Sequence, residues 1–98
     1  MSTGALISRS DISQKYADRE TRLLHELELA LAERPPDDLT LAARVLELGK
    51  YYEEQKQFPI ARDYYEQAIQ IYTRKFGADS YFAVDARKRR ARVLRGRR

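Results

Sequence analysis

The sequence contains no cysteine and no tryptophan, and its single histidine is His25. Without cysteine there is no disulfide, no thiolate metal site and no cysteine nucleophile, and one histidine excludes zinc sites built from several histidines. No apolar run approaches the roughly 7–15 residues of a secretory signal or the about 18 residues of a membrane span. We therefore expect a soluble, cytoplasmic protein that has no membrane span and needs no cofactor or metal.

Sequence patterns that carry catalysis are also missing. His25 falls near the edge of a predicted apolar helix face, and nothing in the sequence singles out an acid or a nucleophile to work with it. The carboxylate pairs Asp37-Asp38 and Glu53-Glu54 fall at a predicted helix start and a predicted turn, where capping and solvation explain them. No phosphate-binding glycine motif occurs. The sequence predicts a protein that is not an enzyme.

Charge is distributed unevenly along the 98 residues. Residues 1–86 carry 11 basic and 15 acidic residues, whereas residues 87–98 carry eight basic residues and no acidic one. The overall charge of +4 therefore reflects the C-terminal end and not the body of the chain. This asymmetry is the main compositional indication of a partner.

Apolar residues recur at helical spacing in four segments, and no segment has the pattern of a strand. The first helix is expected from the cap Asp11 to the breaking pair Pro35-Pro36, and the second begins after Asp37. The third opens at Phe58-Pro59 and ends at Gly77.

The fourth helix begins after Asp79 or Ser80 and continues into the basic end. We expect residues 1–10 to be disordered, residues 11–94 to form one helical domain, and residues 95–98 to be a basic flexible tail.

The second and third helices resemble the tetratricopeptide repeat, a helix–turn–helix unit of about 34 residues. The matching positions are Val45, Leu48, Gly49, Tyr52, Phe58, Ala61, Tyr65 and Ala68. Val45 matches as an apolar residue but replaces the usual tryptophan, and Thr73 replaces the closing proline. The longer ending through Gly77 is similar to the repeat of kinesin light chains.

The resemblance implies an all-α fold, a short antiparallel helix-hairpin array of about four helices with right-handed stacking. It has one full repeat at about residues 39–80 with a half-repeat on each side. Gly49 and Ala61 are expected at the close crossing of the two helices of the full repeat. The family also implies a protein–protein interaction module, an adaptor or scaffold.

In this family the first helix of each repeat lines an inner groove, which implies a partner-binding site in this chain. The residues expected there are Ala43, Leu46, Lys50, Glu53, Lys88 and Arg92. The three cations resemble part of the carboxylate clamp by which some family members hold the C-terminus of a chaperone, although the asparagines of that clamp are absent. Charged hydrogen bonds to a carboxylate would favour an acidic peptide or protein partner.

Three tyrosines outside the repeat pattern, Tyr51, Tyr64 and Tyr72, are candidate aromatic anchors for a partner. The plainer interpretation is half-buried packing between hairpins.

The basic end leaves three interpretations open: a solvated capping helix, an acidic protein partner, or nucleic-acid phosphates. Its residues are Arg87, Lys88, Arg89, Arg90, Arg92, Arg95, Arg97 and Arg98. Because fewer than three repeats bury little surface, we also expect self-association as a homodimer through an exposed flank of the first or fourth helix.

Overall fold

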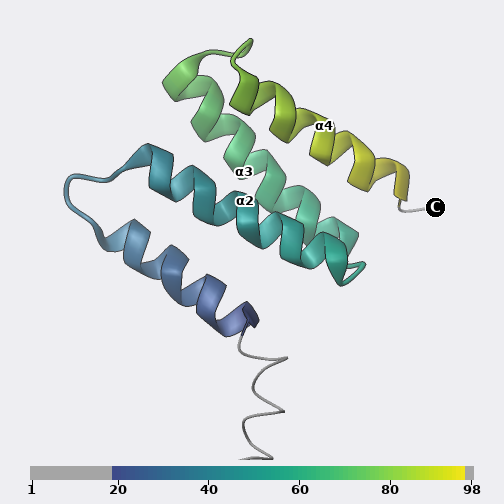
Figure 1. Cartoon of the computed structure of the whole chain (residues 1–98), viewed down its shortest axis with the longest axis horizontal. Coiled ribbons are helices and arrows are strands. Elements are labelled where there is room, and N and C mark those ends of the chain that lie inside the picture. Colours follow the sequence, from purple (N-terminus) through teal and green to yellow (C-terminus); the bar gives the residue numbers. More distant parts are fainter. Residues whose placement is uncertain (1–18, 97–98) are drawn as a thin grey trace, which may run out of the picture.

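The computed structural model describes residues 19–96, and within this range the chain consists of helices without a strand. A helix over residues 19–32 is followed by α2 (Asp38–Glu54), α3 (Phe58–Phe76) and α4 (Tyr81–Gly96). Consecutive helices run antiparallel, and α3 packs against both α2 and α4 (Figure 1). The all-α helix-hairpin array is therefore confirmed. The expected helical start at Asp11 and the expected disorder of residues 1–10 lie outside the described residues.

The predicted helix ends are confirmed where local chemistry specifies them. Asp37 caps α2, because its carboxylate accepts hydrogen bonds from the backbone N–H groups of Leu39 and Thr40. Pro59 lies in the first turn of α3, and Gly77 ends that helix with a φ of 97°, a value that favours glycine. At the start of α4, the Ser80 Oγ accepts from the Ala83 N–H at 3.2 Å.

The C-terminal boundary differs from the expected flexible tail at residues 95–98. Arg95 and Gly96 are the last residues of α4, and residues 97–98 lie outside the described range. Gly96 approaches the Phe58 ring at the start of α3, since a Cβ built on it would stand 3.6 Å from Cζ of that ring. The last residue of α4 therefore lies beside the first turn of α3.

The core is held together by a close approach of α2 to α3. A Cβ on Gly49 would stand 2.6 Å from two carbons of the Tyr65 ring, so the glycine makes room for that ring. Ala61, which lies one helical turn before Tyr65 on α3, is also fully buried. The side chain that Gly49 accommodates, however, is that of Tyr65. A close approach of α3 is therefore present at Gly49, with the Tyr65 ring at the contact where Ala61 was expected.

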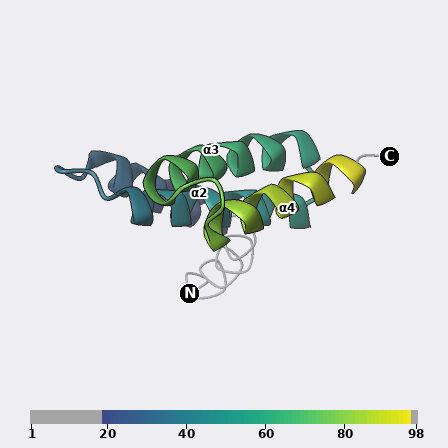
Figure 2. The same cartoon turned by 90° about the horizontal axis from the view of Figure 1, so that it is seen from above.

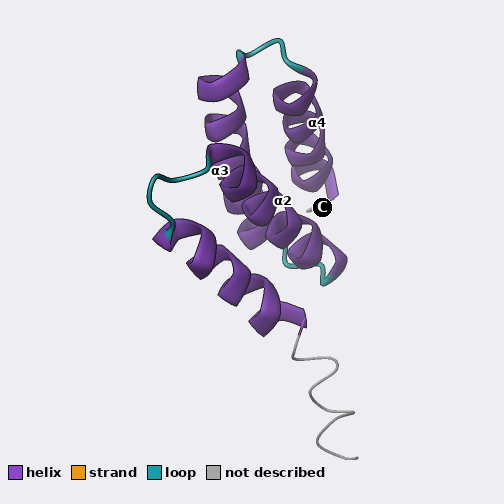
Figure 3. Cartoon of the chain, turned by 60° about the vertical axis from the view of Figure 1, so that its left-hand side comes forward, coloured by secondary structure: helices purple, strands orange, loops and turns teal. Residues whose placement is uncertain are grey.

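The helices form a layered arrangement that gives the array two different faces. In the view of Figure 2, α3 forms one layer, at the top of the picture, and α2 and α4 lie together on its other side. The turned view shows α4 beside α3 and the helix over residues 19–32 away from α4 (Figure 3). The face shared by α2 and α4 is where the candidate site lies.

Candidate functional site

A hollow lies between the C-terminal half of α2 and the C-terminal half of α4. We call it the groove hollow, and it is lined by Lys50, Glu53, Glu54, Lys56, Arg89 and Arg92. Four of these residues are cationic and two are acidic, and none is apolar. The hollow is therefore suited to a charged ligand and lacks the apolar walls typical of a site for a small organic molecule.

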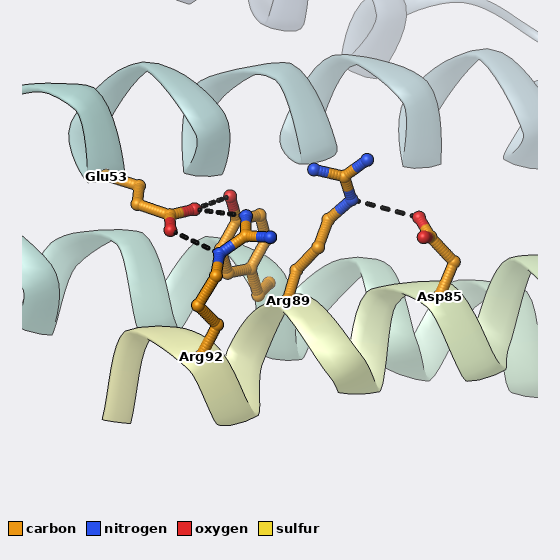
Figure 4. A network of polar contacts seen from close by, with 5 residues as sticks. Glu53, Asp85, Arg89 and Arg92 are labelled. Carbon is orange, nitrogen blue, oxygen red and sulfur yellow. Dashed lines mark hydrogen bonds and ion pairs between the residues drawn. The ribbon is translucent and has the colours of Figure 1, made fainter. Parts of the chain in front are cut away.

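Glu53 links three helices at the edge of the groove hollow (Figure 4). Its carboxylate accepts two hydrogen bonds from the Arg92 guanidinium of α4, from Nε at 2.7 Å and from Nη2 at 2.9 Å. The Tyr65 hydroxyl of α3 donates to Oε1 of the same carboxylate at 2.7 Å. A bidentate arginine–carboxylate pair fixes geometry as well as charge, so this contact sets the spacing of α2 and α4.

The environment of this contact keeps Glu53 ionised. Hydrogen bonds from Arg92 and from Tyr65 lower the pKa of Glu53 despite its partial burial. Burial and the bond to Glu53 raise the pKa of Tyr65 above its ordinary range, so its hydroxyl stays a donor. The hydrogen bond to Glu53 also raises the pKa of Arg92.

A second arginine of α4 is also held inside the array. The Arg89 Nε donates to the Asp85 carboxylate at 2.9 Å, one helical turn earlier (Figure 4). This hydrogen bond raises the pKa of Arg89. Both arginines that line the groove hollow are thus oriented by carboxylates of the chain itself.

Lys50 differs from these arginines because no ion pair joins it to another side chain between residues 19 and 96. It lines the groove hollow and also a neighbouring one, which is bounded by Arg19, Arg22, Leu23, Glu47 and Glu54. Lys50 therefore stands where the two hollows meet, and its ammonium group is available to a ligand in either.

The structure brings together three of the predicted groove residues, Lys50, Glu53 and Arg92. Lys88 is exposed and does not line the hollow. Arg89 lines it from α4 instead. Leu46 is half-buried and packs against the apolar core clusters. Ala43, which was also expected at the groove, does not line this hollow either. Lys88 lies one position before Arg89, and a shift of one position turns a helical side chain by about 100°.

The prediction of exposed tyrosine anchors is wrong for Tyr51 and Tyr72, which are 8% and 4% exposed. Tyr51 packs edge-on against Tyr52, and the Arg19 guanidinium lies 5.2 Å from its ring centroid. Tyr64 is half-buried and stacks on Tyr52 with ring centroids 5.7 Å apart. Packing between hairpins, the plainer interpretation, describes these tyrosines.

The exposed aromatic rings lie instead around the turn between α3 and α4. Phe76, Tyr81 and Phe82 are 43%, 76% and 44% exposed. Phe82 stacks on Tyr72 with centroids 5.2 Å apart, so the cluster continues into the core.

Four of the six basic residues in α4 make contacts within the chain. Arg87 donates to the Ala78 carbonyl at 2.9 Å, and Arg90 lies 3.9 Å from the Glu66 carboxylate. Together with the contacts of Arg89 and Arg92, four arginines of α4 are engaged. Lys88 and Arg95 have no such contact within the described range, and Arg97 and Arg98 lie outside it. The basic end is therefore less free than its sequence indicates.

The single histidine lies at the surface of the first described helix. His25 is exposed, with Nδ1 3.8 Å from the Glu28 carboxylate. No group of three or more potential metal ligands occurs between residues 19 and 96. The described helices include none with the length and apolar character needed to cross a membrane.

Comparison with known proteins identifies the central part of this array. A family model described as tetratricopeptide repeat matches residues 41–81. The match includes Lys50 and Glu53, whereas Arg89 and Arg92 lie beyond it. Comparisons with curated proteins and with solved structures gave no significant match.

Proposed function

We propose that this chain, whose residues 41–81 match a tetratricopeptide-repeat family model, is a non-enzymatic protein-binding module that acts as an adaptor or scaffold. Its groove hollow between α2 and α4 takes an acidic peptide. The observation that carries the proposal is the lining of that hollow, in which four cations face two carboxylates. We further propose that the module self-associates and works in the cytoplasm.

The paired and unpaired cations of the groove hollow have different roles in this proposal. Glu53 occupies Arg92 from one side, but a guanidinium has five N–H donors and only two are used in that pair. Lys50, which has no partner in the described residues, supplies the primary charge for a ligand carboxylate. Arg89 and Arg92, held by Asp85 and Glu53, supply further oriented donors.

A titration with a fluorescein-labelled oligoglutamate peptide, followed by fluorescence anisotropy, tests the groove. Lys50→Glu places a like charge opposite the ligand, and we expect its affinity to fall about tenfold or more. The matched control is Lys88→Glu, since Lys88 is exposed on α4 outside the hollow. An oligoglutamine peptide of the same length measures the contribution of charge.

Two outcomes would reject the groove as the binding site. Equal losses in Lys50→Glu and Lys88→Glu would mean that the peptide responds to net charge alone. Equal affinity for oligoglutamate and oligoglutamine would remove the acidic preference.

The alternative function is nucleic-acid binding through the arginine-rich end. Four of its arginines contact groups of the chain, so in this alternative Lys88 and Arg95, which have no such contact in the described residues, supply the main phosphate contacts. A labelled duplex or single strand tests it. If nucleic acid binds and Lys88→Glu with Arg95→Glu abolishes that binding while peptide affinity is unchanged, the alternative holds.

A further inference from the structure

The two ends of the array carry opposite charge. Residues 23–33 of the first described helix and its end contain three glutamates, Glu26, Glu28 and Glu33, and no lysine or arginine. Helix α4 contains six basic residues and one acidic residue, Asp85. Figure 1 shows these two helices on opposite sides of the array. The first described helix therefore has an acidic stretch between Arg22 and Arg34, whereas α4 at the other end of the array is strongly basic.

The acidic end contains a hollow with an apolar floor. This acidic hollow is lined by Glu26, Leu29, Ala30, Glu33, Thr40 and Arg44. Leu29 is 56% exposed there, a large fraction for a leucine. The Arg44 guanidinium lies 3.8 Å from Glu26 and 3.3 Å from Glu47, so it already has acidic partners. Glu33 has no ion pair among the described residues. The hollow is therefore suited to an apolar side chain flanked by cations.

Helix α4 carries apolar residues flanked by cations along one of its sides. Val84, Arg87, Ala91 and Leu94 recur at i, i+3, i+7 and i+10, which places them on one face of the helix. This α4 outer face is distinct from the buried positions Ala83, Ala86 and Val93. Leu94 is 41% exposed, and the small Ala91 lets another helix approach closely.

We infer that a second copy of this chain docks its α4 outer face onto the acidic hollow, so that copies join head to tail. Leu94 of one copy covers Leu29 of the next. The cations that flank Leu94 on α4 face Glu26 and Glu33 of that next copy. A symmetric contact between two α4 helices is disfavoured, because it would oppose six cations on each side, and juxtaposed like charges are costly. The inference rests on the self-association proposed above but is independent of peptide binding.

A head-to-tail contact has a consequence that a symmetric dimer lacks. Each copy keeps one free acidic hollow and one free α4 outer face, so the contact can repeat into chains or rings. The average mass should therefore rise with concentration beyond that of a dimer. Because opposite charges are brought together, added salt should weaken the association.

Two variants, each blocking one end, test the inference by analytical ultracentrifugation. The hollow variant combines Leu29→Lys with Glu33→Lys, and the face variant combines Leu94→Glu with Arg95→Glu. All four residues are exposed, so the fold should survive, as circular dichroism would verify. We expect each variant alone to be monomeric. Their mixture should form a 1:1 dimer that does not grow, since only one intact pair of surfaces remains.

A matched control changes the same residue types on the same helix outside the acidic hollow. Glu28→Lys with Leu31→Lys replaces an exposed glutamate and an exposed leucine that do not line it. This control should associate like the unmodified chain.

Three results would overturn the inference. In the first, the unmodified chain is monomeric at every concentration, which would show that a second copy does not bind the acidic hollow. The second is undiminished dimerisation of either blocked variant alone, which would indicate a symmetric contact. The third is loss of association in the control. None of these results would change the Lys50→Glu titration, so failure of this inference is distinguishable from failure of the groove.

Discussion

Gly49 of α2 and Tyr65 of α3 are in such close contact that a Cβ at residue 49 would stand 2.6 Å from both Cδ1 and Cε1 of the ring. The Tyr65 side chain has no exposed surface, and its hydroxyl is bonded to Glu53. The ring therefore has little room to move. The absence of a side chain at residue 49 is a requirement of the α2–α3 crossing.

We predict that Gly49→Ala destabilises the protein although alanine is the better helix former. The gain in helix propensity is about 1 kcal/mol, and overpacking a rigid contact costs about 1–3 kcal/mol or more, so the free energy of unfolding should fall. Urea denaturation measures the change. Gly96→Ala is the matched control: its Cβ would stand at an ordinary 3.6 Å from Phe58, so it should be neutral or stabilising.

A second substitution separates the clash from other effects of Gly49→Ala. In Tyr65→Leu the ring is absent, and adding Gly49→Ala to it should cost less than in the unmodified chain, because the two changes share one contact. Strictly additive effects would show that the Tyr65 ring is not what Gly49 accommodates.

The features that sequence could predict are those specified within a few residues. Asp37 and Ser80 cap helices through hydrogen bonds to N–H groups two or three residues later, so the caps are visible in sequence. Gly49 in a helix interior likewise indicates a close neighbour. The repeat spacing then orders α2 and α3 as a hairpin, without further information.

The features that sequence missed depend on the rotation of one helix against another. Arg89 and not Lys88 lines the groove hollow, and a helical pattern does not specify rotation to a single residue when four basic residues are consecutive. The burial of Tyr72 depends on Phe82 covering it from α4. Glu53 and Arg92 are 39 positions apart in the sequence, so no local pattern predicts that they pair. Their opposite charges on facing helices were the one available indication of this pair.

The contact between Glu53, Tyr65 and Arg92 should be measurable in a double-mutant cycle. The Arg92 side chain is 54% exposed, so we expect Arg92→Ala to cost only about 0.5–1 kcal/mol. Glu53→Ala should cost more, about 1–3 kcal/mol, because it also leaves the buried Tyr65 hydroxyl without its acceptor. Arg95→Ala is the control, since Arg95 is exposed and has no partner in the described residues. Unfolding free energies that add without coupling would argue against the pair.

Stability should decrease in acid, and part of the decrease should belong to Glu53. Hydrogen bonds from Arg92 and Tyr65 lower the pKa of Glu53 in the folded chain, so the unfolded chain takes up its proton first as the pH falls. The contribution of Glu53 is present at neutral pH and is lost below about pH 5. Glu53→Gln should therefore flatten the fall of unfolding free energy between about pH 5 and 3.

Some acid dependence should remain in Glu53→Gln, and its source can be tested. A hydrogen bond from the Thr40 side chain, with others from the backbone, lowers the pKa of Asp37. This contribution is likewise lost as the pH falls. Asp37→Asn keeps a capping oxygen but cannot titrate, so adding it to Glu53→Gln should flatten the curve further. A curve identical to that of the unmodified chain would assign the acid dependence to other carboxylates.

The aromatic cluster at the α3–α4 turn should divide into one structural ring and one dispensable ring. Phe82 stacks on the buried Tyr72 and lies 5.5 Å from Phe76, so Phe82→Ala uncovers both rings and should cost about 1–2 kcal/mol. Tyr81 is 76% exposed and touches Phe82 only by an edge, so Tyr81→Ala should stay within about 0.5 kcal/mol. Thermal unfolding of the two variants compares them directly. Equal losses would mean that the exposed Tyr81 ring contributes as much as the stack of Phe82 on Tyr72, which would contradict this division.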